Sequence, residues 1–258
     1  MPDGAHDRPY FYKNATYMKK IRLVVFDMAG TTIRDNHEVE SCIFEAALLT
    51  GLDISPNRVH DMNGLPKRLV FETLWKDVIG ASHPDYPGKV EKSYEAFREI
   101  LERHYRTEPV HPTEGAVETL GWLRAIGVKI AFNTGFYREV ADIILRRLGW
   151  DKGLDEKYSG GDLIDLSVTP SETGGKGRPH PDMILYAMDM LGISDPKEVV
   201  KIGDAPVDIL EGKAAGCRLS LGLTNGCHRR EELEAVLPDG LLGSLHELKA
   251  FLEGRKLV

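Results

Sequence analysis

Short apolar runs alternate with amphipathic stretches along most of this chain. The first run, Ile21–Phe26, is rich in β-branched residues and ends at Asp27, which is typical of a buried strand in a parallel sheet. Similar runs predict further strands at 128–133, 163–168, 199–202 and 219–223. Helical patterns lie between and after them, at 114–126, 138–148, 181–191, 207–215 and 244–253. This alternation predicts an α/β fold, a Rossmann-like parallel sheet covered by helices on both faces.

The segment between the first predicted strand and the second has a different texture. Helical patterns occupy 38–51, the stretch from 56, 68–78 and 87–105, and no strand pattern interrupts them. We therefore predict an inserted all-helical cap at 36–112, with the core formed by 20–35 and 113–258. Residues 1–19 lack the apolar stretch of a signal peptide and are interpreted as an N-terminal extension. Its aromatic side chains, Tyr10, Phe11, Tyr12 and Tyr17, are candidates to pack on the core.

Composition narrows the class of protein. The 258 residues hold 33 Lys and Arg against 40 Asp and Glu, a net charge of −7, so general nucleic-acid binding is not expected. No apolar run reaches the roughly 18 residues that span a bilayer, so no membrane partner is expected either. Three scattered cysteines, Cys42, Cys217 and Cys227, are too few for a disulfide framework, which favours reduced thiols and a cytoplasmic location.

Candidate chemistry lies in loops that follow predicted strands, where an open parallel sheet places its ligands. Asp27 directly follows the first strand, three residues before Gly30. A carboxylate there can be a nucleophile, a metal ligand or both, although a turn aspartate before glycine is an equally ordinary interpretation. Thr134 and Gly135 follow the second strand. They offer a hydroxyl and backbone N–H groups to a phosphoryl oxygen, or a simple helix cap.

Two further loops carry charged residues. Arg178 lies in the stretch Gly-Arg-Pro-His-Pro at 177–181, where two prolines stiffen the loop and aim a guanidinium suited to phosphate or phosphonate. A surface arginine is the alternative, and Lys176 is the competing cation. Asp204 and Asp208 lie four residues apart, at a strand end and in the first turn of the next helix. Paired carboxylates in this arrangement suit Mg²⁺.

Taken together, these four signals in fixed order resemble the haloacid dehalogenase superfamily of phosphotransferases, over about residues 20–255. The resemblance implies that Asp27 attacks phosphorus and that Thr134 and Arg178 hold the phosphoryl group. Ala29, Gly30 and Gly135 are expected beside that group as backbone contacts. It also implies a Mg²⁺ site formed by Asp27, Asp204 and the Ala29 carbonyl, with Asp208 acting through water.

One position separates this chain from the phosphatases of the superfamily, which carry a second aspartate two residues after the nucleophile as general acid. Here that position is Ala29. The stretch from Asp27 to Thr32, Asp-Met-Ala-Gly-Thr-Thr, resembles phosphonoacetaldehyde hydrolase (phosphonatase), which has alanine there. That family also carries a cap lysine after Gly-Leu-x, and Gly64-Leu-Pro-Lys67 matches this motif.

The resemblance implies a Schiff-base role for Lys67. An amine that condenses with an aldehyde beside the C–P bond makes an iminium, which accepts the bond's electrons when phosphorus leaves. Two other roles for Lys67 stay open, recognition of substrate charge and a solvated position at a helix start. The family places Met before this motif and His three residues after the lysine, where this chain has Asn63 and Val70.

We therefore expect a Mg²⁺-dependent hydrolase that cleaves the C–P bond of a small phosphonate such as phosphonoacetaldehyde. The alternatives are a phosphomonoesterase that uses Lys67 for recognition, and a non-catalytic sensor of phosphorylated ligands. Retention of Asp27 argues against the sensor, because a binding protein needs no nucleophile. Residues 38–51 are a candidate surface for a homodimer formed through the cap.

Overall fold

The structure is a computed structural model that describes residues 20–62 and 64–258. The predicted N-terminal extension, with its four aromatic residues, and Asn63 lie outside the described residues.

A six-stranded parallel sheet forms the core, in the order β3-β2-β1-β4-β5-β6. Its strands are β1 (Leu23–Phe26), β2 (Lys129–Asn133), β3 (Leu166–Val168), β4 (Val199–Gly203), β5 (Leu219–Leu223) and β6 (Gly240–Leu242). This confirms the predicted parallel α/β fold and its five strands. The sequence analysis missed β6, because three residues are too short to show a periodic pattern.

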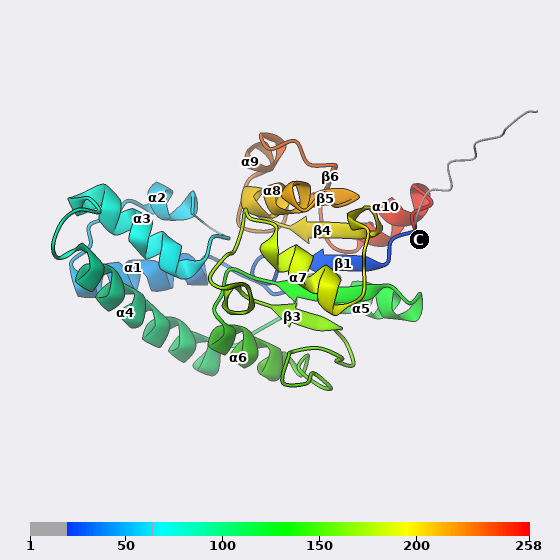
Figure 1. Ribbon diagram of the computed structural model, residues 1–258, viewed down its shortest axis with the longest axis horizontal. Coiled ribbons are helices and arrows are strands. Elements are labelled where there is room, and N and C mark those ends of the chain that lie inside the picture. The colour runs from blue at the N-terminus through cyan, green and yellow to red at the C-terminus, as the bar shows by residue number, and fades with distance from the viewer. Residues whose placement is uncertain (1–19, 63) are drawn as a thin grey trace, which may run out of the picture.

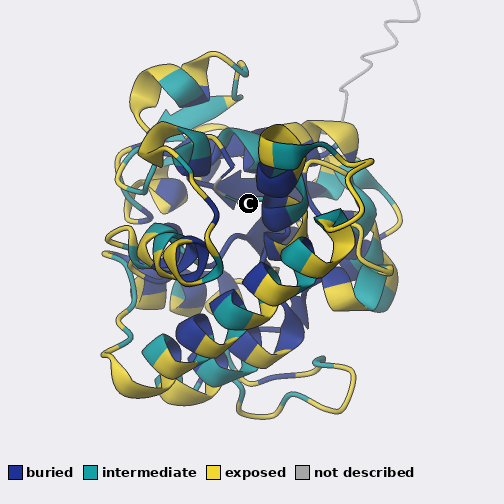
Figure 2. Cartoon of the chain, turned by 90° about the vertical axis from the view of Figure 1, so that its left-hand side faces the viewer, coloured by how far each residue is buried: buried dark blue, intermediate teal, exposed yellow. Residues whose placement is uncertain are grey.

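Alternation along each strand sorts the apolar side chains to the two faces of the sheet. Leu23 and Val25 pack with α7 on one face, whereas Val24 and Phe26 pack with α5, α6 and α10 on the other. The strands are therefore buried on both sides, as a parallel sheet requires. The core helices are α5 (Ala116–Ala125), α6 (Arg138–Leu148), α7 (Asp182–Met190), α8 (Pro206–Ala214), α9 (Arg230–Glu234) and α10 (Glu247–Gly254). Figure 2 shows the buried residues gathered at the sheet and on the inward faces of the helices.

Four helices form a helical cap beside the sheet: α1 (Glu38–Thr50), α2 (Pro56–His60), α3 (Lys67–Ile79) and α4 (Tyr86–Thr107). Figure 1 shows them together at one end of the molecule, and the arrowheads of β1 and β4 point toward them. The carboxyl ends of these strands therefore face the cap. The exact domain boundaries at 35/36 and 112/113 stay predictions.

The cap has its own core. Phe71 of α3 is fully buried, with its ring centroid 5.4 Å from that of Phe97 of α4. A short polar chain joins three cap helices: Trp75 Nε1 donates to Ser93 Oγ at 2.9 Å, and Ser93 Oγ is hydrogen bonded to Thr50 Oγ1 at 2.7 Å. These contacts hold α1, α3 and α4 as one packed unit.

Ion pairs connect the cap to the sheet domain. Arg98 Nη2 of α4 lies 3.6 Å from Glu139 Oε1 of α6. His60 Nε2 of α2 lies 3.6 Å from Glu232 Oε2 of α9. The ring of His60 also contacts that of His228, at 4.7 Å between centroids.

The outer surface bears on two of the partner predictions. Leu48 on α1 is 82% exposed, so this helix presents an apolar side chain at the surface. The homodimer through the cap stays a prediction. None of the helices in the described part of the chain has the length and apolar character needed to cross a bilayer.

Replacing Phe71 by alanine will leave a cavity between α3 and α4 and lower the free energy of unfolding by about 3–5 kcal/mol. Chemical denaturation measures this loss. Leu69→Ala on the same helix is the control, because Leu69 is 41% exposed and its truncation opens no comparable void. Equal losses for the two variants would contradict the packing described here.

Candidate active site

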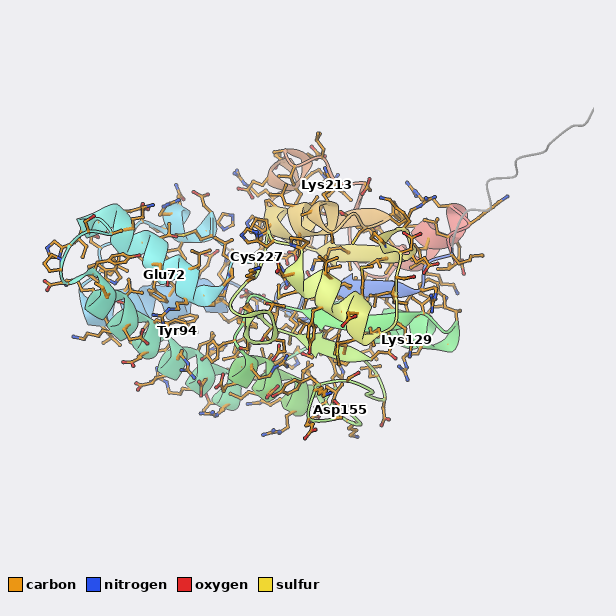
Figure 3. All side chains as sticks on the ribbon, in the orientation of Figure 1. Glu72, Tyr94, Lys129, Asp155, Lys213 and Cys227 are labelled. Atoms are coloured by element: carbon orange, nitrogen blue, oxygen red, sulfur yellow. The ribbon has the colours of Figure 1, made fainter. Side chains whose placement is uncertain are left out.

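The strand ends bring most of the predicted site residues to one cavity. Asp27 follows β1, Thr134 follows β2 and Asp204 follows β4, and these three strands are adjacent in the sheet. The side facing the sheet is lined by Asp27, Ala29, Thr134, Gly135, Arg178 and Asp204. The cap and its linker contribute Asp35, Val39, Gly64 and Lys67, and the loop after β5 contributes Cys227 and His228. Figure 3 shows Cys227 at the junction of cap and sheet.

Three carboxylates form a compact, buried group at the base of this cavity. One oxygen each of Asp27, Asp204 and Asp208 lies within 4.8 Å of the others. Thr31 Oγ1 donates to Asp204 Oδ1 at 3.0 Å, and the Cys227 N–H donates to Asp204 Oδ2 at 2.8 Å. Both oxygens of Asp204 are therefore fixed in direction.

The absence of a side chain at Gly30 leaves space for the carboxylate of Asp204. The φ of 82° at this glycine lies in the left-handed region, and a Cβ at this position would lie 2.3 Å from Asp204 Oδ2. A side chain at residue 30 would therefore displace the carboxylate, which explains why the turn after β1 contains glycine.

Negative charge is in excess at the carboxylate group. Burial, together with repulsion from Asp27 and Asp208, raises the pKa of Asp204 to about 8. Burial also raises the pKa of Asp27, although Arg178 opposes the shift. Three carboxylate oxygen donors, held close and short of positive charge, fit a hard divalent cation.

Arg178 lies at the centre of a buried charge network. Its side chain is 1% exposed, and Nη2 donates to Asp27 Oδ1 at 2.5 Å and to the Asn133 carbonyl at 2.6 Å. Nη1 lies 3.0 Å from Asp208 Oδ1, and Nε lies 3.4 Å from Glu211 Oε2. The structure thus places the predicted phosphoryl-binding arginine beside the predicted nucleophile. Lys176, the competing cation, is exposed and pairs with Asp182.

The sequence analysis missed three members of this network. Lys201 Nζ, on β4, lies 2.8 Å from Asp208 Oδ1 and donates to Asn133 Oδ1 at 2.7 Å. Asn133 Nδ2 donates to both carboxylate oxygens of Glu211, at 2.8 and 2.9 Å. Two signals were available: a lysine inside an apolar strand, and a glutamate three positions after Asp208 on the same helix face.

Arg178 and Lys201 determine the electrostatic setting of Asp208. Attraction from Arg178 and Lys201 outweighs the effect of its burial and lowers the pKa of Asp208. Oδ1 faces the two cations, and Oδ2 accepts from the Ala205 N–H at 3.2 Å. Asp208 therefore links the carboxylate group to the arginine.

Thr134 and Gly135 both line the cavity, and the helix-cap alternative for Thr134 also has support. Thr134 Oγ1 accepts from the Phe136 N–H at 3.2 Å, which is a local capping contact. A Cβ on Gly135 would lie 2.7 Å from the carbonyl oxygens of Gly64 and Leu65. Gly135 is thus the point where the cap loop meets the strand end. His180, two residues after Arg178, is exposed and does not line this cavity.

Lys67, the first residue of α3, reaches the cavity through that cap loop. Gly64 has a φ of 82°, and a Cβ there would lie 2.6 Å from Val207 Cγ2 of α8. The loop therefore fits tightly against the sheet domain and carries the following lysine inward. Only 6% of Lys67 is exposed, so the solvated position at a helix start was wrong.

The amine of Lys67 is poorly compensated for a buried cation. Burial lowers its pKa, and the carboxylates of Asp35 and Asp27 only partly offset this effect. Its Nζ lies 5.9 Å from the centre of the Phe136 ring. Burial therefore disfavours the charged form of this amine.

Comparison with known proteins places the chain in a family. Residues 21–216 match the haloacid dehalogenase-like hydrolases. The phosphonoacetaldehyde hydrolase of Bacteroides fragilis is 29% identical over 242 residues, which is 90% of this chain and 88% of that protein. The phosphonoacetaldehyde hydrolase of Bacillus cereus is 32% identical over 213 residues, covering 76% of this chain and 74% of its own length.

Solved structures agree on the fold. A phosphonoacetaldehyde hydrolase-like protein from Oleispira antarctica covers 93% of this chain, and 95% of that protein is covered, with a TM-score of 0.76 at 19% identity. A predicted phosphoglycolate phosphatase from Haemophilus somnus covers 91% of this chain and 99% of its own, with a TM-score of 0.72 at 20% identity. The chain belongs to the haloacid dehalogenase-like hydrolases and is an enzyme of that family.

Replacing Lys201 by methionine will lower the free energy of unfolding by about 3–5 kcal/mol, because Asp208 and Glu211 lose a buried counter-charge. Urea unfolding measures the change. Lys249→Met on α10 is the matched control, because Lys249 is exposed, and a shift within about 0.5 kcal/mol is expected for it. A Lys201 variant as stable as this control would show that the network contributes nothing to folding.

Proposed function

We propose that this haloacid dehalogenase-like hydrolase cleaves the carbon–phosphorus bond of a small phosphonate carrying an aldehyde, such as phosphonoacetaldehyde. The observation that carries the proposal is the buried amine of Lys67, whose pKa is lowered by burial and which lines the same cavity as Asp27. The curated relatives named phosphonoacetaldehyde hydrolase support the same substrate class.

Lys67 is the proposed electron acceptor. Its neutral amine attacks the substrate aldehyde, and the adduct takes up one proton and loses water to give an iminium. When phosphorus leaves, the electron pair of the C–P bond moves onto the carbon and toward the iminium nitrogen, which forms an enamine. Burial favours this role because it lowers the pKa of Lys67 and so enlarges the fraction of neutral amine.

Ala29 fits the same chemistry. In a phosphate ester the leaving group is an alkoxide, which needs a proton donor, and such a donor contributes roughly 10²–10⁴-fold. Ala29 lines the cavity but has no acidic group. In the proposed reaction no oxyanion leaves, so the methyl group suffices there.

Asp27 is the proposed nucleophile. Its Oδ1 accepts from Arg178, so the guanidinium holds the carboxylate in place and leaves Oδ2 for the attack on phosphorus. The product is an aspartyl phosphate, which water then hydrolyses to phosphate and free Asp27. Protonation of the enamine carbon, followed by imine hydrolysis, releases acetaldehyde and restores Lys67.

We propose that the groups around Asp27 bind the phosphoryl oxygens of the substrate. Arg178 supplies positive charge, and Thr134 supplies a hydroxyl at the carboxyl end of β2. Gly30 and Gly135 are proposed as backbone contacts, and the space that a side chain would take at each is filled by Asp204 and by the cap loop. These roles extend the sequence prediction for Ala29, Gly30, Thr134, Gly135 and Arg178.

A Mg²⁺ ion is the proposed cofactor. The carboxylates of Asp27 and Asp204 and the Ala29 carbonyl would hold it, with Asp208 reached through water because its Oδ1 faces Arg178 and Lys201. When bound, the ion supplies positive charge that offsets the repulsion between the carboxylates and the phosphoryl group.

Cavity size favours a small substrate. The space enclosed between cap and sheet has a volume of about 30 Å³, which is room for one or two water molecules. A phosphonate of a few heavy atoms therefore needs the cap to move outward before it can enter, and a bulky substrate does not fit beneath the cap.

The second candidate function is hydrolysis of a small phosphate ester, with Lys67 as a recognition residue. One observation favours it: the amine of Lys67 is buried and lines the same cavity as Arg178, so its charged form could bind an anionic substrate group there. The trapping experiment below separates the two functions.

Incubation with phosphonoacetaldehyde and borohydride will inactivate the enzyme, because reduction of the imine leaves a stable secondary amine on Lys67. Mass spectrometry of the digested protein will locate the added mass at that residue. Lys67→Arg will abolish both trapping and C–P cleavage, since a guanidinium does not condense with the aldehyde.

Lys76→Arg is the matched control, because Lys76 is an exposed residue of the same helix and its replacement leaves trapping unchanged. Absence of trapping in the wild-type enzyme, together with rapid turnover of alkyl phosphates, would replace the first proposal by the phosphomonoesterase.

Addition of Mg²⁺ will raise the Tm of the wild-type enzyme, corresponding to about 2.7 kcal/mol at one hundred times the dissociation constant. Asp204→Asn will lose this response but keep its stability without metal, because the substitution removes one of the mutually repelling carboxylates. Asp189→Asn on the exposed side of α7 will respond like wild type. A full Mg²⁺ response in Asp204→Asn would place the ion elsewhere.

A further inference from the structure

We infer that Asp35 is the acid–base residue of imine formation, carrying protons from the Lys67 nitrogen to the departing oxygen of the substrate. The inference rests on the proposed function, and its experiment is chosen to separate the two.

Asp35 lies where the chain leaves the sheet domain for the cap. The Arg34 N–H donates to the His111 carbonyl at 2.9 Å, which joins the outgoing linker to the returning one. The Glu38 N–H, at the start of α1, donates to Asp35 Oδ1 at 2.9 Å. One carboxylate oxygen is thereby anchored, and Asp35 lines the cavity together with Lys67.

The proposed reaction needs such a residue. An ammonium and an aldehyde combine to an iminium and water, so two protons must pass from nitrogen to oxygen. A carboxylate can take the first proton from the ammonium, deliver it to the oxygen after attack, and then move the second in the same direction. The carboxylate ends unchanged, and the oxygen leaves as water.

Other lining residues are less suited to this task. Burial raises the pKa of the Cys227 thiol far above neutrality, so it stays protonated. Thr134 Oγ1 is engaged with the Phe136 N–H. Asp27 and Asp204 belong to the phosphoryl and metal chemistry. His228 is the remaining rival, but its ring packs on His60, and Asp35 acts more strongly on Lys67 than any other charged group does.

The surroundings of Asp35 raise its pKa, so that both the carboxylate and the carboxylic acid can form near neutral pH. Burial, with a further contribution from Glu38, raises the pKa of Asp35 to about 7, against the attraction of Lys67. Cys42 of α1, Tyr105 of α4 and Cys227 also feel its charge, and burial raises the pKa of each of them. A carboxyl group that titrates near neutral pH is well matched to proton transfer.

Asp35→Asn tests the inference, because asparagine keeps an oxygen for the Glu38 N–H but cannot transfer the proton. We expect the rate of borohydride trapping at Lys67 by phosphonoacetaldehyde to fall by about 10²-fold, with kcat falling in parallel. Asp35→Ala will be equally slow, and added formate will restore part of its trapping rate by acting as a diffusible acid–base. Asp53→Asn, an exposed cap residue, will match wild type.

The outcomes separate the two proposals. If the wild-type enzyme is not trapped, the proposed function fails and this inference fails with it. If the wild type is trapped and Asp35→Asn is trapped equally fast, only the role of Asp35 is overturned. A loss in His228→Gln without one in Asp35→Asn would assign the proton transfer to the histidine.

Discussion

A fully buried guanidinium surrounded by carboxylates is the constraint on which the rest of the site depends. Arg178 contacts Asp27, Asp208 and Glu211. The burial of its guanidinium is tolerable only because these carboxylates compensate its positive charge. The partners come from the end of β1 and from α8, with Lys201 of β4 completing the network. The network that joins the end of β1 to β4 and α8 therefore also orients Asp27, the proposed nucleophile.

Much of this arrangement was predictable from the order of residues along the chain. Apolar runs located five strands, and the polar residue after each of three central strands entered one cavity, because parallel strands end at a common edge. The prediction failed where pattern gives no information. Three residues of β6 are too few to show a period, and Lys201 carries a charge inside an apolar run, where its partners come from distant segments.

Lys67 shows where sequence reasoning has to stop. Its motif left three roles open, and only the three-dimensional position removed one of them, because a residue at a helix start has no burial pattern of its own. The same holds for Asp35, which looks like an ordinary linker aspartate until the cap folds over it. Both side chains acquire their electrostatic setting from tertiary structure, since burial and opposing charges come from segments far away in the sequence.

The contact between the cap loop and the sheet domain has a kinetic consequence. Gly64, Gly135 and Gly177 meet Val207, the loop backbone and Pro66 so closely that an added methyl group would collide at each. Because the two parts fit together this tightly, the cavity between them is small. In the proposed reaction, substrate entry and product release would each require the two parts to separate, and the frequency of that opening would then limit turnover however fast the bond cleavage is.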